Sequence, residues 1–228
     1  AAHSFGIPST ALVGSGTVAA GGDPSFRLKG RDSMTEVKIT HNAERLKKQI
    51  KKIDSKFGKL CNSQYQLHVI DNLKWFNSIG LLQFLRLVGP KLRIIHLLEK
   101  DSMKTRLESG ENTATFGEFC YPVMQAFDFY TLSENQNISI QLGGIDQWGN
   151  MSTGMELISK ASQQPRPTMA ICTPLLTDSS GNKMGKSGAK GQIWLDESKT
   201  KQFDFYQVRF LSYCSISSEL KIQQWNCI

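Results

Sequence analysis

Residues 138–150, "ISIQLGGIDQWGN", carry the strongest indication of the fold. Aliphatic residues at every second position from 138 to 142 are typical of a half-buried strand. The two glycines that follow allow the backbone to approach a ligand closely, and Asp146 and Gln147 come next, with a helix expected from about Met151. Two glycines and an aspartate alone also suit a plain turn that caps the next helix. The complete stretch predicts a strand, a ligand-binding loop and a helix.

The segments around this stretch repeat the alternation of strand and helix. Strand-like runs at 10–13, "TALV", and 169–177, "MAICTPLLT", alternate with helical patterns at 39–57 and 116–134. This order predicts an α/β fold with a parallel sheet and helices on both faces. Such sheets bind ligands beyond the carboxyl ends of their strands, and each unusual loop of the chain follows such an end.

Composition indicates a globular protein without a membrane partner. The 228 residues are 39% hydrophobic and 21% charged, and no apolar run approaches the roughly 20 residues of a membrane span. The five cysteines are an odd number without C-x-x-C spacing, which indicates a reducing compartment. No signal peptide is visible, and a chain that begins without Met is expected to be incomplete.

The positive charge is concentrated in one block. Of the net charge of +7, the segment from Arg27 to Lys59 holds eleven Lys and Arg against four Asp and Glu. Residues 39–57 have apolar residues at helical spacing, and Gly58 is placed to end this helix. The block is either the solvated face of an amphipathic helix or a surface for polyanions.

Two glycine-rich motifs resemble phosphate-binding loops without matching them. "GSGTVA" at 14–19 fits the dinucleotide pattern, but the acids at the required interval, Asp32 and Glu36, lie in a basic segment, which excludes NAD. "GNKMGKS" at 181–187 has three residues between its glycines, where a P-loop requires four.

The helix expected at 116–134 has two distinct faces. Tyr121, Gln125 and Asp128 share one face at helical spacing. The opposite face is expected in the core and consists of Phe116, Phe119, Val123, Phe127 and Tyr130. The polar face is either solvated or lines a cleft, where a buried Asp would meet a phenol or an amine.

Two further loops have charged residues suited to a ligand. "GGDPS" at 21–25 reads as a turn, and its Asp23 could also pair with an ammonium group. The Gly- and Ser-rich loop at 179–191 contains Lys183, Lys186 and Lys190; these are ordinary surface lysines or residues that close over a polyphosphate.

Taken in order, these motifs resemble the tyrosyl-tRNA synthetases of the bacterial and mitochondrial type, which are class I aminoacyl-tRNA synthetases. The similarity extends from about Ala11 to Gln207 and includes "GGDPS", "YPVMQAFDF", "QLGGIDQWGNMSTGMELI", "GNKMGKS" and "FDFYQ". "GGDPS" together with "DQWGN" is the most specific part. The lysine loop is a variant of the class I signature in which Gly185 replaces the usual serine.

The resemblance implies a domain organisation. Residues 1–207 would form the class I catalytic domain, a Rossmann-like parallel sheet incomplete at its N-terminus, with a helical dimerisation insertion at about 60–115. Residues 208–228 would be a divergent tail, and the anticodon-binding domain would be absent. The apolar residues of 81–89 suit a dimer interface and equally a buried core helix.

The resemblance also implies an activity and its residues. The chain would activate tyrosine with ATP and Mg²⁺ and pass it to tRNA(Tyr) in mitochondrial translation, with Asp128 accepting the phenol. The residues implied to bind tyrosine are Asp23, Tyr121, Gln125, Asp128, Gln141 and Gln147. Those implied to bind ATP are Gly143, Gly144, Asp146, Lys183 and Lys186. The two lysines would act in catalysis by holding the triphosphate, and no residue is expected to ligate a metal.

Two alternatives remain open at this point. "YPVMQA" also suits a tryptophanyl-tRNA synthetase, the sister enzyme. No two histidines form the H-x-G-H signature of class I enzymes, so the chain is expected to activate tyrosine poorly or to be a non-catalytic fragment that binds RNA or a partner. A homodimer is expected, and the expected compartment is the mitochondrial matrix or, alternatively, the bacterial cytoplasm.

Overall fold

A computed structural model describes residues 6–21, 34–60, 66–100, 104, 115–175, 198–206 and 222–223. The chain divides into two compact units. The first consists of Ala1–Ser139 and Gly149–Pro167, and the second of Ile140–Trp148 and Thr168–Ile228. In the described part of the chain, no helix is both long enough and apolar enough to cross a bilayer.

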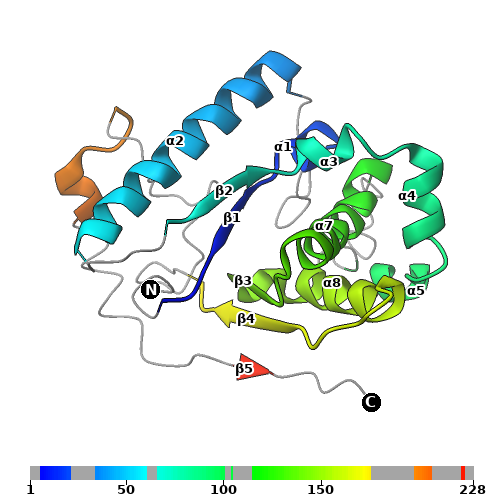
Figure 1. The fold of residues 1–228 in the computed structure, drawn as a ribbon. Helices are drawn as coiled ribbons and strands as arrows, with labels where there is room; N and C mark the ends of the chain where they lie inside the picture. Colours follow the sequence, from blue (N-terminus) through cyan, green and yellow to red (C-terminus); the bar gives the residue numbers. More distant parts are fainter. Residues whose placement is uncertain are drawn as a thin grey trace. The chain divides into compact units, whose positions relative to one another are not determined.

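The first unit is built on a pair of parallel strands (Figure 1). β1 (Thr10–Val13) pairs with β2 (His68–Asp71), so that Val13 lies opposite Asp71. The short helix α1 (Ser15–Ala19) follows β1 directly, and α2 (Glu36–Leu60) contacts both strands and α1. The strand expected at 10–13 and the parallel pairing are confirmed. β2 has no clear periodicity in its four residues and was not expected.

Helix α2 forms because its apolar residues recur at helical spacing and meet the two strands. Ile39 and Ala43 are buried on that side. The helix continues to Leu60, so the expectation that Gly58 ends it is wrong. A side chain at Gly58 would meet no atom within 4 Å, and nothing there opposes one more turn of helix.

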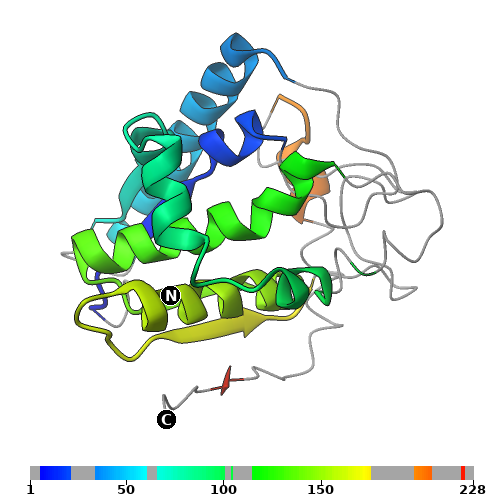
Figure 2. The same cartoon turned by 90° about the vertical axis from the view of Figure 1, so that its right-hand side faces the viewer.

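The other helices of the first unit enclose its core. They are α3 (Leu73–Phe76), α4 (Leu81–Val88), α5 (Ile94–Leu98), α7 (Phe116–Gln136) and, from Gly149 onward, α8 (Trp148–Ala161). Figure 2 shows α7 beside α8. The buried cluster consists of Val88, Leu92, Ala126, Phe127 and Leu157. The ring of Phe84 packs edge-on against that of Phe127, with their centroids 5.2 Å apart.

Helix α7 begins and ends at well-defined caps. Thr115 and Glu118 form a capping box at its first turn, and Asn137 ends it in the left-handed conformation with φ 56°. The expectation for Phe116 is wrong, because its side chain is 80% exposed. The packed cluster reaches along α7 only from Val123 to Tyr130, so the first turn projects beyond it.

The second unit is a three-stranded sheet. β3 (Ile140–Gly144) runs parallel to β4 (Met169–Thr173), and β5 (Ile222–Gln223) is antiparallel to β4. A 3-10 turn, η2 (Ile145–Gln147), follows β3 and leads into α8. The strand starts two residues later than the alternation suggests, because the backbone N–H of Ile138 still donates to Leu132 at the end of α7.

Candidate functional site

The carboxyl group of Asp128 is the best-defined polar centre of the first unit. Its side chain is 5% exposed. The indole Nε1 of Trp75 donates to one carboxylate oxygen at 2.8 Å, and Nδ2 of Asn72 donates to the other at 3.0 Å. Of the two interpretations of this helix face, burial with hydrogen-bonding neighbours is therefore confirmed for Asp128, and the solvated face is wrong for it.

Asn72 holds this arrangement in one orientation. It is fully buried directly after β2. Its Oδ1 accepts from the backbone N–H of Gly16 at 2.7 Å, which leaves Nδ2 for Asp128. Because a backbone N–H only donates, turning the amide over would break both bonds. Asn72 therefore fixes a donor against Asp128.

Asn72 and Trp75 were missed in the sequence. A weak signal exists, since polar residues that directly follow a parallel strand are common at ligand sites, and "IDN" at 70–72 is such a position. The four-residue strand β2 could not be recognised from the sequence without its partner strand. The position of Asn72 at the end of a strand was therefore not visible.

Burial controls the charge of Asp128. Removal from water raises its pKa to about 7, against the opposing effect of the hydrogen bonds from Asn72 and Trp75. The nearby negative charge of Asp71 raises this pKa further. Near neutral pH the carboxyl group therefore exchanges a proton readily, and its charge responds to whatever hydrogen bond a ligand offers.

Asp71 stays ionised at the same end of β2. Burial alone would raise its pKa, but hydrogen bonds from Ser15, Lys47 and the backbone of Leu73 outweigh that effect and hold the pKa below its usual value. Lys47 Nζ lies 2.9 Å from Asp71 and 2.9 Å from Glu44, and these bonds raise the lysine's pKa. The ion pair joins α2 to the polar end of β2.

The rest of the polar face of α7 is half-buried. The buried side chain of Asn150, in α8, donates from Nδ2 to Oε1 of Gln125 at 3.1 Å. Tyr121 is likewise half-buried. Tyr121, Gln125 and Asp128 therefore share one helix face that is withdrawn from solvent, as the cleft interpretation requires.

A half-buried lysine anchors the first turn of α8. Nζ of Lys100 donates to the backbone carbonyl of Gly149 at 2.5 Å, and burial lowers the pKa of this lysine. Thr153 Oγ1 donates to the same carbonyl at 2.8 Å. These bonds hold the backbone next to Asn150, which in turn holds Gln125.

The second unit gathers a carboxylate and a carboxamide at the end of β3. Gln147 Nε2 donates to Asp146 at 3.3 Å. A Cβ atom on Gly144 would lie 2.5 Å from Oδ1 of Asp146, so glycine is required for the carboxylate to lie against the backbone. Thr173 Oγ1 donates to the carbonyl of Gly143 at 3.3 Å and ties the loop to β4.

Gln141, in the middle of β3, has an unusual side chain. Its Oε1 is buried and accepts no hydrogen bond from the described residues. An acceptor removed from water without a partner is costly. A donor group on a ligand would remove that cost.

The remaining expected site residues lie in different parts of the chain. Asp23, Lys183 and Lys186 lie outside the described residues. Tyr121, Gln125 and Asp128 belong to the first unit, whereas the five expected ligand residues from Gln141 to Gln147 belong to the second. Convergence of these groups on one ligand stays a prediction. Within the described ranges, no cluster of three metal-ligating side chains occurs.

Parallel strands that alternate with helices define the class of this chain as an α/β protein. The chain belongs to the family described as tRNA synthetases class I (W and Y), which matches residues 6–212. The expected fold class, α/β with a Rossmann-like parallel sheet, is thereby confirmed.

The chain is similar to individual proteins that are named as tyrosine enzymes. The chain is 41% identical over 204 residues to a tyrosine–tRNA ligase of Mycoplasmopsis synoviae, covering 90% of this chain and 46% of the relative. It resembles a truncated mitochondrial tyrosyl-tRNA synthetase of Aspergillus nidulans at 30% identity and a TM-score of 0.72, covering 90% of this chain and 59% of that one. The equivalent enzyme of Coccidioides posadasii gives 29% and 0.67, covering 90% and 58%. The chain spans about half the length of the curated relatives it matches.

Proposed function

We propose that the chain is the catalytic part of a tyrosine–tRNA ligase, which joins tyrosine to AMP and passes it to tRNA(Tyr). The observation that carries this proposal is the buried carboxyl group of Asp128, held by Asn72 and Trp75. The relatives reported above are named as tyrosine enzymes, which favours tyrosine over tryptophan as the substrate.

Asp128 is proposed to recognise the phenol of tyrosine. Each carboxylate oxygen has two lone pairs and already accepts one hydrogen bond, so each can accept another. The hydroxyl group of tyrosine would donate to one of them. Phenylalanine has no such group and would leave the buried carboxyl group without this partner, which opposes its binding.

Other expected residues would bind the remaining groups of tyrosine. Asp23, Tyr121 and Gln125 would bind the ammonium group; Gln125 has an acceptor oxygen whose position Asn150 fixes. Gln147 would bind the carboxylate through its amide N–H group, with Gln141 nearby. The buried Oε1 of Gln141, which has no hydrogen-bond partner among the described residues, is an acceptor and suits a donor group of the ligand, not the carboxylate.

ATP is proposed to bind at the glycine loop. Gly143, Gly144 and Asp146 would hold the ribose, because the carboxylate beside Gly144 can accept from sugar hydroxyls. Lys183 and Lys186 would hold the triphosphate. Mg²⁺ would accompany ATP and neutralise charge on its phosphates.

The chemistry needs no nucleophile from the protein. The carboxylate of tyrosine attacks the α-phosphate, the bond to the β-phosphate breaks, and pyrophosphate leaves with that electron pair. The protein would accelerate this step by positioning the two substrates and by stabilising negative charge that develops on the phosphates.

Assembly and location are part of the same proposal. Leu81, Leu82 and Leu85 of α4 are 71%, 73% and 50% exposed, which suits a second copy of the chain as their cover. The mitochondrial structures support the mitochondrial matrix, and the bacterial relatives support the bacterial cytoplasm as the alternative.

Equilibrium titration of the chain with tyrosine, phenylalanine and tryptophan tests the proposal. Tyrosine should bind at least about tenfold more tightly than phenylalanine, since a hydrogen bond to a charged group is worth about 1.5–3 kcal/mol. Asp128→Ala should remove this preference. Glu99→Ala, which removes an exposed carboxylate elsewhere, should keep it.

Exchange of pyrophosphate into ATP then separates binding from catalysis. Tyrosine-dependent exchange supports the complete activity. Selective tyrosine binding without exchange supports the non-catalytic alternative, which the basic helix α2 favours. Equal binding of phenylalanine and tyrosine, or tighter binding of tryptophan, contradicts the tyrosine assignment.

A further inference from the structure

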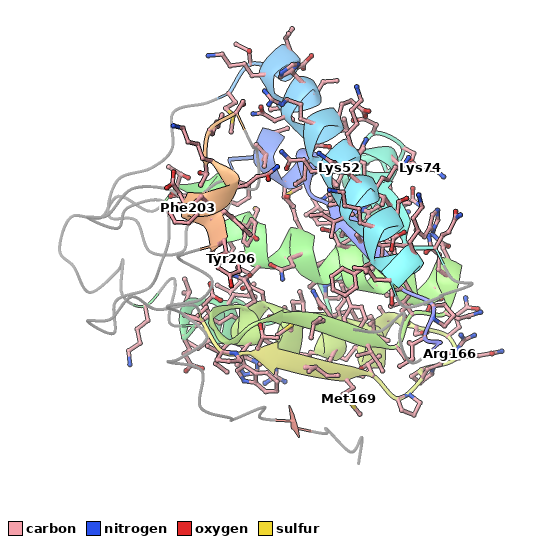
Figure 3. The ribbon with its side chains drawn as sticks, turned by 90° about the vertical axis from the view of Figure 1, so that its left-hand side faces the viewer. Lys52, Lys74, Arg166, Met169, Phe203 and Tyr206 are labelled. Carbon is pink, nitrogen blue, oxygen red and sulfur yellow. The ribbon has the colours of Figure 1, made fainter. Side chains whose placement is uncertain are left out.

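Helix α2 carries far more positive charge than its role in the fold requires. It contains eight Lys and Arg against three Asp and Glu. Its apolar side meets β1 and β2, where Ile39 and Ala43 are buried. Most of its lysines are exposed instead of packed, and Figure 3 shows their side chains along α2 with Lys52 labelled.

Six of these basic residues form one straight row. At 100° per residue they fall within about 80° of one another on the side of the helix that faces away from Ile39 and Ala43. The row, called here the basic stripe, consists of Lys38, Arg45, Lys48, Lys52, Lys56 and Lys59. All six are exposed. At about 1.5 Å per residue the stripe extends over about 30 Å.

Two of the acidic residues of α2, Glu44 and Asp54, have partners outside the stripe. Glu44 pairs with Lys47, and Lys47 is itself directed to Asp71 and lies outside the stripe. Asp54 accepts a hydrogen bond from the backbone N–H of Leu67.

Four of the stripe lysines have no side-chain partner in the described part of the chain. Among the described residues, Lys38, Lys48, Lys56 and Lys59 make no side-chain ion pair or hydrogen bond. A row of unpaired cations on a rigid helix is an electrostatic surface for an extended polyanion.

We propose that the basic stripe of α2 binds the phosphate backbone of an RNA helix without reading its sequence. From Arg45 to Lys59 the stripe offers a cation every three or four residues, about 5 Å apart, so several phosphates can be contacted at once. The side of α2 that carries the stripe contains no Phe, Tyr or Trp on which a base could stack, which favours backbone contacts to a duplex over single-strand binding.

RNA is proposed in place of a lipid surface because of how the apolar residues of α2 are placed. Ile39 and Ala43 are buried against the two strands, and the arc of the helix that carries the stripe has no apolar residue to insert into a lipid surface. The charge pattern alone suits RNA and DNA equally. The choice of RNA over DNA rests on the proposed function, in which tRNA is a substrate. The stripe would contact any helical stem and is independent of the tyrosine site.

The test measures binding of a labelled blunt RNA duplex of about 20 base pairs to the 228-residue chain by fluorescence anisotropy, over a range of salt. The stripe variant is Lys48→Gln, Lys56→Gln and Lys59→Gln, and glutamine keeps the helix propensity of lysine. The control variant, Arg86→Gln, Arg93→Gln and Lys201→Gln, removes the same charge from exposed positions outside α2.

The unmodified chain and the control should bind with a steep salt dependence. In the stripe variant, the slope of log affinity against log salt should fall by about 3. Between about 50 and 200 mM salt, the unmodified chain should therefore lose roughly 60-fold more affinity than the stripe variant. Tyrosine binding should be unchanged in the stripe variant. Loss of RNA binding with intact tyrosine binding shows that the effect does not come from damage to the proposed tyrosine site.

Three results would overturn the inference. One is the absence of duplex binding by the unmodified chain at low salt. Another is equal loss in the stripe and control variants, which would reduce the effect to net charge. The last is a stripe variant that binds RNA normally but loses binding to phosphatidylserine vesicles, which would assign the stripe to a membrane.

Discussion

Replacing Trp75 by Phe should destabilise the protein in a pH-dependent manner. The change keeps most of the ring but removes the indole donor that lies 2.8 Å from Asp128. The pKa of Asp128 is about 7 in the folded chain, against an ordinary value of 3.8. At about pH 5 the folded state therefore holds a neutral carboxyl group, and at about pH 8.5 it holds a carboxylate.

The sign and size of the effect follow from this shift. Between the two pKa values the unfolded state has lost the proton and the folded state keeps it, so stability falls as the pH rises. At about 1.4 kcal/mol per unit, the difference between about 7 and 3.8 corresponds to about 4 kcal/mol. Trp75→Phe raises the folded pKa further. It should cost about 1–1.5 kcal/mol more at pH 8.5 than at pH 5, because a hydrogen bond to a charged acceptor is worth more than one to a neutral acceptor.

Urea unfolding of both proteins at the two pH values measures this difference. Repeating the comparison with Asp128→Asn in both chains completes a double-mutant cycle, in which the pH-dependent part should vanish. An equal loss at both pH values, or a larger loss at pH 5, would refute the role of Trp75 as a donor to the ionised carboxyl group.

Three other substitutions test the surrounding structure by urea unfolding. Asn72→Asp places a second buried carboxylate against Asp128 and should lower the free energy of unfolding by at least about 3 kcal/mol at pH 8.5. The loss should be smaller at pH 5, where the two carboxyl groups share a proton. A loss that does not depend on pH would count against a shared proton. Gly58→Ala should stabilise by about 0.5–1 kcal/mol, because it lies inside α2 with no atom within 4 Å of the new Cβ. Gly154→Ala should lower the free energy of unfolding by about 1–3 kcal/mol, because its Cβ would lie 3.0 Å from the Phe129 ring. If both glycine variants raised the free energy of unfolding, or both lowered it, the packing described for the two sites would be contradicted.

The sequence by itself determined the features that depend on local patterns. The strand at 10–13 and the helices on either side of β3 follow from periodicity and turn residues, which neighbouring residues decide. The strand expected at 169–177 is also present, but it ends at Thr173, directly before Pro174. The motif "DQWGN" and the row of lysines on α2 were likewise visible in the sequence. Asp128 could be named as a candidate, but its burial could not.

Only the tertiary structure decided the surroundings of that carboxyl group. Asn72 and Trp75 lie 56 and 53 residues from Asp128 along the chain, and no local pattern joins them. The same holds for Lys47 and Asp71, whose ion pair joins α2 to the end of β2. Burial and hydrogen bonding depend on which segments meet in space. The charge of Asp128, and with it the chemistry it offers to a phenol, is therefore set by packing.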